Sequence, residues 1–200
     1  MKSIENFIFN IDIPTGEPQK GSLLVSEPFL KEEWFSHSVI CLIEHEKNSS
    51  SMGVVMNRRI PFSLQKLMDG VERREKIPVY CGGPMSRDRL FFIHRLGDVI
   101  PDSRQVTDDL FVSGDFRVMK EYINSGEPLE GRIRFFVGYS GWERHQLEGE
   151  IANRVWAVTS IANARSLLTG YGDAYWHRYV RSMGDPYKGW LYHPENIHQN

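Results

Sequence analysis

Cysteine is scarce in this sequence, and its scarcity excludes several kinds of site. The 200-residue chain has two cysteines, Cys41 and Cys81, and neither belongs to a CxxC motif or to a Cys/His spacing typical of zinc. A disulfide framework and a metal site are therefore not expected. Both cysteines lie in apolar segments, where a reduced thiol packs as a small hydrophobic side chain. Redox sensing through an accessible Cys81 thiol is the alternative hypothesis.

The sequence also has no large excess of acidic or basic residues and no long apolar run. The formal net charge is −2, with acidic and basic residues interspersed, whereas a protein that binds DNA through charge carries a basic face. Direct DNA binding is therefore not expected. No apolar run reaches the length of a membrane-spanning helix, and the N-terminus lacks the pattern of a signal peptide. We expect a cytoplasmic protein with no membrane partner, and no motif implies a cofactor.

The composition is that of a globular domain, with 40% hydrophobic and 25% charged residues. A Pro- and Gly-containing stretch ends an N-terminal arm at residues 1–20, and no linker divides residues 21–200, which are expected to form a single domain. Strand patterns crowd the first two thirds of the chain, including a hairpin at 38–59, and helical patterns fill a C-terminal extension at 160–200. This order predicts an α+β fold.

Alternation of side chains identifies two strands in particular. Residues 38–46 carry apolar side chains on both faces, which predicts a strand buried on both sides. In residues 132–140, Ile133, Phe135 and Val137 alternate with two arginines. This second pattern predicts a strand with one apolar face and one arginine-bearing face.

Helix starts and ends are predicted from capping residues. A short helical turn is expected after Pro28, and Gly126 is expected to close a helix that begins near residue 116. The side chains predicted to cap helices are Ser63, Ser113, Ser140 as a capping box with Glu143, and Asp173.

Two glycine-containing turns are candidate binding elements. Gly138 and Gly141 precede a predicted helix, and glycines there would let a ligand or another chain segment approach the backbone closely. Gly82 and Gly83 stand before Pro84 in the sequence CGGP, but the GxxxxGK[ST] pattern of a phosphate loop is missing. For both turns, a purely structural role is the alternative interpretation.

Catalysis is a second hypothesis. His94 would act as an acid or base on a small or phosphorylated substrate, with Arg58 as an anion clamp and Glu148 as a second acid or base. This mechanism requires the three side chains to converge within hydrogen-bond reach. His94 would also be the partner that activates Cys81 if that thiol were a nucleophile.

Five segments, taken in order, resemble the bacterial YqgE/AlgH family. They are GSLLVSEPFL, SVICLIEHE, MGVVMNRR, VYCGGPMSRDRLFFIHR and GYSGWERHQLEGEIANRVW, and the resemblance is strongest over residues 21–158. It implies a single α+β domain with a bent, branched, mostly antiparallel sheet that includes a small barrel-like portion, flanked by helices. Members are mostly uncharacterised; one branch is named for a proposed regulatory role in alginate synthesis. The resemblance therefore implies no reaction and no cofactor.

The residues that match the family's motifs form a candidate binding groove between the 82–84 turn and the 138–148 turn and helix. They are Asn57, Arg58, Gly82, Gly83, Pro84, His94, Gly138, Trp142, Gln146 and Glu148. The sequence departs from the family pattern at Arg59, where a proline is common, and at Glu143–His145, where a glycine-containing step is common. The favoured hypothesis is a binding or regulatory protein with a protein or small molecule as partner, and the enzyme described above is the alternative.

Overall fold

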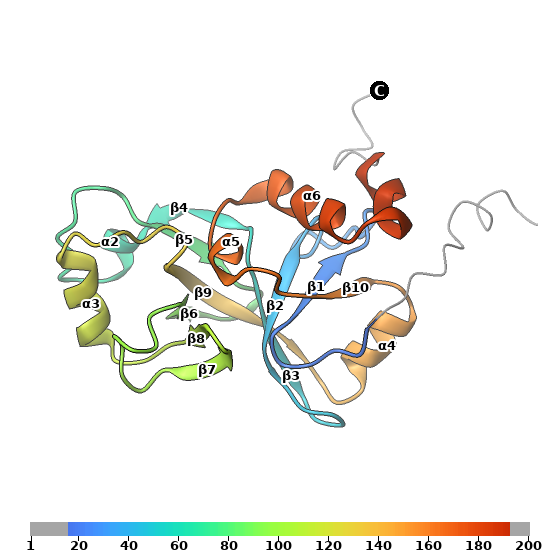
Figure 1. Ribbon diagram of the computed structural model, residues 1–200, viewed down its shortest axis with the longest axis horizontal. Helices are drawn as coiled ribbons and strands as arrows, with labels where there is room; N and C mark the ends of the chain where they lie inside the picture. The colour runs from blue at the N-terminus through green and yellow to red at the C-terminus, as the bar shows by residue number, and fades with distance from the viewer. Residues whose placement is uncertain (1–15, 193–200) are drawn as a thin grey trace, which may run out of the picture.

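The computed structural model describes residues 16–192, and the strands of this part form a mostly antiparallel sheet that curls into a half-barrel (Figure 1). The strands are β1 Ser22–Ser26, β2 Val39–His45, β3 Ser51–Val55, β4 Arg59–Ser63, β5 Pro78–Cys81, β6 Met85–His94, β7 Arg104–Thr107, β8 Leu110–Val112, β9 Ile133–Trp142 and β10 Trp156–Ser160. The helices are α2 Leu64–Leu67, α3 Phe116–Asn124, α4 Gln146–Ala152, α5 Ala164–Leu167, α6 Gly172–Ser182 and a 3-10 helix, Asp185–Tyr192.

Strand β9 joins two lobes of the molecule. The first half of β9 lies between β5, which pairs with it in parallel, and β6, which pairs with it in antiparallel orientation. The second half of β9 pairs with β3, which continues the sheet through β2 and β1 to β10. Strand β4 pairs with β5 and lies off the main strand order. We call β4–β8 with α2 and α3 the small lobe, and β1–β3 and β10 with α4 and α6 the large lobe (Figure 1). The predicted α+β fold with a bent, branched sheet is confirmed.

The predicted burial of strand β2 on both faces is also confirmed. Val39 and Cys41 pack in the core that includes side chains of α6, whereas Ile40 and Leu42 pack with side chains of α4 and β10. Strands β2 and β3 form the predicted antiparallel hairpin. Strictly alternating side chains thus supply two cores from one strand, because successive residues point to opposite faces.

Two predicted caps are wrong because other groups satisfy the backbone at those positions. Helix α3 is capped by Asp115, whose carboxylate accepts hydrogen bonds from two N–H groups of the first turn, rather than by Ser113. Ser140 lies inside β9, and its hydroxyl donates to the carbonyl of Gly82 at 3.1 Å. Helix α4 begins only at Gln146, so the predicted capping box does not form.

The remaining local predictions have mixed outcomes. Residues 28–37 form turns instead of the expected helical turn. Ser63 ends β4 and makes no capping hydrogen bond to α2. Asp173 lies within the first turn of α6 rather than at its cap. Gly126 follows the last residues of α3 with φ +88°, as expected for a glycine that closes a helix.

The two ends of the chain are described only in part. Residues 16–20 of the predicted N-terminal arm contain a turn and no helix or strand, and residues 1–15 lie outside the described residues. Within the predicted C-terminal extension, α5, α6 and the 3-10 helix occupy most of residues 164–192, and residues 193–200 lie outside. No helix among residues 16–192 is long and apolar enough to cross a membrane.

Candidate functional site

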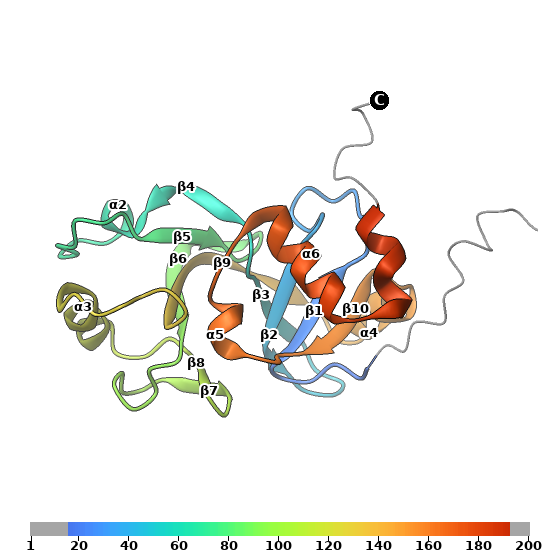
Figure 2. The same cartoon turned by 45° about the horizontal axis from the view of Figure 1, so that its top comes forward.

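A cavity of about 530 Å³ lies where the small lobe meets the connection between α5 and α6. Figure 2 shows this connection passing beside β5 and β9. Four segments line the cavity: the start of β4, residues 73–80, residues 128–135 and residues 168–171. Its volume is within the range of small-molecule sites in proteins, which is roughly 300–1,000 Å³. We call it the interlobe cavity.

The lining combines apolar and basic side chains. The apolar ones include Ile77, Leu129, Ile133, Phe135 and Leu168, and the basic ones are Arg59, Arg73, Lys76 and Arg134. Glu75 and Glu130 are the acidic members. A mainly apolar wall with a few charged groups is the usual composition of a site for an organic ion.

Arg134 is the most unusual residue of this lining because it is a buried cation. Its side chain projects from β9 and only 4% of the residue is exposed. The guanidinium donates to the carbonyl of Met56 at 2.6 Å and to that of Gly170 at 2.9 Å. It also lies over the ring of Tyr80, 4.2 Å from the centroid, which is a favourable cation–π distance.

No carboxylate neutralises this guanidinium within residues 16–192. Arg134 is absent from every ion pair of that part of the chain. An arginine side chain has five N–H groups, and the two carbonyls take only two of them. Buried charges are normally paired, because removing an ion from water without a partner is strongly unfavourable. The cavity therefore presents a cation with spare donors and no counter-ion.

Tyr171 forms the aromatic part of the opposite wall. It precedes α6, is 55% exposed, and its ring lies under the guanidinium of Arg59, 5.4 Å from Cζ to the ring centroid. Both residues line the interlobe cavity. A planar ligand entering the cavity would meet an exposed aromatic face and a second arginine there.

Asn57, one of the predicted site residues, holds this wall in place. Its side-chain amide donates to the carbonyls of His37 and Gly172, and its side-chain oxygen accepts from the N–H of Val39. The N–H of Gly172 donates in turn to the carbonyl of Asn57 at 2.8 Å. Asn57 thus ties the start of α6 to the hairpin and positions neighbouring Tyr171 without touching the cavity itself.

Arg58, predicted as an anion clamp, binds backbone instead. Its guanidinium donates to the carbonyls of Trp34 and Ser36 at 2.8 and 3.0 Å. Its own carbonyl accepts from the N–H of Cys81, the last residue of β5. These bonds fasten the turns at residues 28–37 to the sheet.

The Gly82–Gly83 segment packs against β9. The turn predicted at Gly138 and Gly141 is wrong, because β9 runs through both glycines. A Cβ atom built on Gly82 would lie 2.2 Å from the carbonyl oxygen of Gly138, and one on Gly83 would lie 2.3 Å from the backbone of Tyr139. The N–H of Gly82 also donates to the carbonyl of Val137. The close backbone approach that these glycines permit is to another chain segment, while neighbouring Pro84 is exposed.

Trp142 and Gln146 belong to a hydrogen-bond network around Glu150, a residue that the sequence did not single out. The indole N–H of Trp142 and that of Trp156 both donate to Glu150, and the Gln146 amide donates to its second oxygen at 2.9 Å. Glu148 lies one residue after Leu147 and is half-buried on the same helix. The network joins α4 to the ends of β9 and β10.

His94 lies in the core of the small lobe, with both ring nitrogens bonded. The N–H of Leu96 donates to Nδ1, so Nε2 carries the proton and donates to the carbonyl of Ser113 at 2.9 Å. Burial lowers the pKa of the His94 ring, although the bond to Ser113 opposes this shift. A fully bonded, buried imidazole has no free position from which to transfer a proton.

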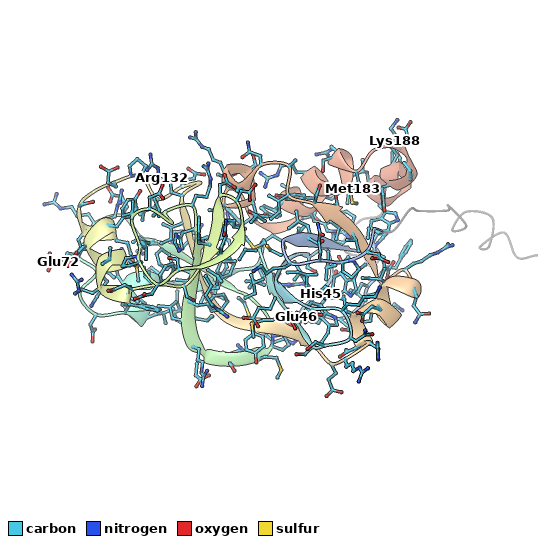
Figure 3. The ribbon with its side chains drawn as sticks, turned by 60° about the horizontal axis from the view of Figure 1, so that its bottom comes forward. His45, Glu46, Glu72, Arg132, Met183 and Lys188 are labelled. Carbon is cyan, nitrogen blue, oxygen red and sulfur yellow. The ribbon has the colours of Figure 1, made fainter. Side chains whose placement is uncertain are left out.

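The structure does not bring His94 and Glu148 together. His94 pairs with Ile133 at one end of β9, whereas α4 follows Trp142 at the other end, nine residues and up to about 30 Å further along the strand. Figure 3 shows the two lobes from another side, with Arg132, just before β9, in the small lobe and His45, at the end of β2, in the large lobe. The mechanism that needs both side chains is therefore not formed.

Both cysteines are buried. Burial raises the pKa of the Cys41 thiol to about 12, so this residue stays protonated at neutral pH. The thiol of Cys81 is directed at the carbonyl oxygen of Gly83, 3.5 Å away. The accessible thiol required by the redox hypothesis is not found at either position.

The fold and its junction strand define a mixed α+β protein with a half-barrel sheet, and comparison with known proteins identifies the family. The model of the AlgH-like family matches residues 23–188. The chain belongs to this family, and the match includes helices α5 and α6. Among curated relatives, a UPF0301 protein of Parabacteroides distasonis is 41% identical over the full length of both chains. A UPF0301 protein of Bacteroides thetaiotaomicron is 36% identical over 96% of this chain and 97% of its own.

Two solved structures share the fold. A crystal structure of a Corynebacterium diphtheriae protein has a TM-score of 0.71 and 23% identity, covering 91% of this chain and 95% of its own. The solution structure of the AlgH protein from Pseudomonas aeruginosa has a TM-score of 0.67 and 24% identity, covering 86% and 94%. At these identities the likeness concerns the fold alone.

Proposed function

We propose that this chain is a cytoplasmic regulatory protein that binds a small carboxylate or phosphate anion in the interlobe cavity. The observation that carries the proposal is Arg134, a buried guanidinium with spare donors beside a cavity of suitable size. A bound carboxylate or phosphate would supply the missing counter-charge and accept the remaining N–H groups. The two buried, unpaired cysteines fit a reducing compartment.

Binding is favoured over catalysis by the state of the candidate catalytic groups. His94 is bonded at both nitrogens, and Arg58 is bonded to two backbone carbonyls. These hydrogen bonds hold segments of the chain together, and neither side chain lines the interlobe cavity. The lining supports a regulatory role, because Tyr171 and Gly170 belong to the connection that leads into α6. An anion bound to Arg134 would change how firmly this connection is held.

The proposal is tested by calorimetric titration of the full chain with inorganic phosphate, citrate and AMP. At least one of these anions should bind, and at one hundred times its Kd it should stabilise the fold by about 2.7 kcal/mol. Arg134→Gln should weaken that binding about 10- to 100-fold, since a buried hydrogen bond to a charged group is lost.

Arg178→Gln is the matched control. Like Arg134, Arg178 lies over an aromatic ring and donates to two carbonyls. Its ring partner is Tyr175, 4.5 Å from Cζ to the centroid, and Arg178 does not line the interlobe cavity. The control should bind the anion as the unmodified chain does. The proposal would be abandoned if none of the three anions bound, or if both variants bound with unchanged affinity.

A further inference from the structure

A second cavity adjoins the interlobe cavity along β4. This second cavity, of about 460 Å³, is lined by residues 59–63 together with Lys66 and Lys76. Arg59 and Lys76 line both cavities, so the two share a boundary. Arg59 and Ser63 lie four residues apart on β4, which is about 13 Å along the strand. The combined site is therefore longer than a single phosphate or carboxylate group.

Positive charge gathers along this combined site although the whole chain is weakly acidic. Five cationic side chains line the two cavities against two carboxylates, a local balance of +3 in a chain whose formal net charge is −2. Arg73 is paired with Glu75 at 3.1 Å. The four remaining cations, Arg59, Lys66, Lys76 and Arg134, form no ion pair with any carboxylate of residues 16–192.

These cations are arranged in two ways that suit different parts of one ligand. Arg134 is held by two carbonyls and is buried, whereas Lys66 and Lys76 are exposed and line the β4 cavity. Fixed arginines select an anion by geometry, and lysines act as mobile point charges along a phosphate chain. Several unpaired cations in a row favour a ligand with several negative charges.

The interlobe cavity also contains the aromatic surface of Tyr171, next to Arg59. Tyr171 is 55% exposed, and the Cζ atom of Arg59 lies 5.4 Å from the centroid of its ring. A purine or pyrimidine ring stacks well on such a side chain, and arginine adds to the contact through its planar guanidinium. Apolar side chains of Ile77 and Leu129 complete the wall.

We infer that the ligand of the combined site is a nucleoside polyphosphate, with its ring at Tyr171 and its phosphates spread over the unpaired cations. This inference rests on the proposed function and names the class of anion that the interlobe cavity binds. The phosphates of such a ligand match the positive charge of the site, its length matches the two adjoining cavities, and its ring can stack on Tyr171. A single phosphate ester would fill only part of the site.

The test compares ATP, AMP and inorganic tripolyphosphate by calorimetric titration of the full chain, at one ionic strength and without divalent cations. ATP should bind at least tenfold more tightly than AMP, because only ATP reaches both cavities. Tripolyphosphate should bind at least tenfold more weakly than ATP, since it lacks the ring. Equal affinities for ATP and AMP, or for ATP and tripolyphosphate, would overturn the inference.

Two variants connect these affinities with the site. Lys66→Gln should weaken ATP binding roughly fivefold and leave AMP binding unchanged, because Lys66 lines the β4 cavity but not the interlobe cavity. Lys47→Gln, on the exposed β2–β3 turn, is the control and should change neither. If Lys66→Gln weakened the binding of ATP and AMP equally, the result would also contradict the inference. If a phosphate or citrate binds through Arg134 while ATP has no advantage over AMP, this inference fails and the proposed function stands.

Discussion

The indole N–H groups of Trp142 and Trp156 point to the same carboxylate oxygen, Oε2 of Glu150, at 2.8 and 2.7 Å. Both tryptophans are buried, and their rings meet edge to face with centroids 6.2 Å apart. A single carboxylate thus satisfies two donors that would otherwise be lost from water. The arrangement fixes α4 against the ends of two strands that are consecutive in the sequence but not neighbours in the sheet.

Replacing Glu150 with glutamine should therefore destabilise the fold. The amide oxygen can take the place of Oε2 and keep both indole bonds, but the amide nitrogen then faces the Gln146 donor instead of accepting from it, and the negative charge is lost. The expected loss is about 1–3 kcal/mol of unfolding free energy. Urea unfolding followed by tryptophan fluorescence measures it directly. Glu148→Gln, on the same helix but outside the network, is the control and should change stability by about 0.5 kcal/mol or less. Equal effects of the two substitutions would show that the network is not stabilising.

Glycine should be required at position 82, because the backbone there lies directly against the backbone of β9 at Gly138. In Gly82→Ala the new Cβ would lie 2.2 Å from the carbonyl oxygen of Gly138, a contact that real Cβ atoms do not show. One of the two segments must shift, and a loss of about 3 kcal/mol or more is expected from strain of this kind. Circular dichroism during thermal unfolding provides the measurement.

Gly149→Ala is the matched control for that substitution. Gly149 lies inside helix α4 and nothing lies within 4 Å of a Cβ built on it. Alanine should stabilise the helix there by roughly 0.5–1 kcal/mol, because it is the better helix former. A tolerated alanine at 82 would mean that this segment and β9 are not closely packed in solution.

Much of the fold can be predicted from the sequence because strand alternation is a local signal. The apolar side chains of residues 39–43 divide between two cores as their order requires, and the strand at 133–137 behaves likewise. Helix caps are harder to predict, since a polar side chain has several possible partners. Ser140 bonds across the sheet to Gly82, and Asp115 rather than nearby Ser113 lies at the start of α3.

The candidate site could not be predicted because its lining comes from four separate segments of the chain. Arg134 is visible in the sequence only as an arginine that alternates with aromatic residues, a pattern equally typical of a solvent-facing side chain. Its burial depends on Tyr80 and on the α5–α6 connection, which pack around it in three dimensions. The motif residues, by contrast, are prominent in the sequence because they hold turns and strands together.

Asp173 should stabilise the attachment of α6 to the sheet. Its carboxylate accepts from Nδ1 of buried His37 at 2.5 Å and lies 2.9 Å from Nδ1 of His177. The His37 ring also stacks on Trp176, with centroids 4.1 Å apart. In Asp173→Asn only one oxygen remains as an acceptor and the negative charge is lost. We expect a loss of about 1–3 kcal/mol in urea unfolding.

Asp185→Asn serves as the control for Asp173. Asp185 is also near the C-terminal helices and is also paired, with Lys188, but the pair is exposed. Exposed pairs contribute little, so this substitution should leave the urea midpoint unchanged. If Asp173→Asn left it unchanged as well, the two histidines would not depend on the carboxylate.

Stability should fall below neutral pH through His94. Burial lowers the pKa of His94 in the folded chain, whereas an unfolded histidine titrates near about 6.5. As the pH falls through about 6.5 the unfolded state takes up a proton first, so the contribution of neutral His94 is complete above that pH and declines below it. Urea unfolding at pH 7.5, 6.5 and 5.5 should show the decline.

The control variant is His94→Gln, whose amide can still donate to Ser113 but does not titrate. In this variant the slope of unfolding free energy between pH 6.5 and 5.5 should be smaller by up to about 1.4 kcal/mol per pH unit. Other titrating groups are common to both chains, so identical slopes would mean that His94 is protonated equally in the folded and unfolded states.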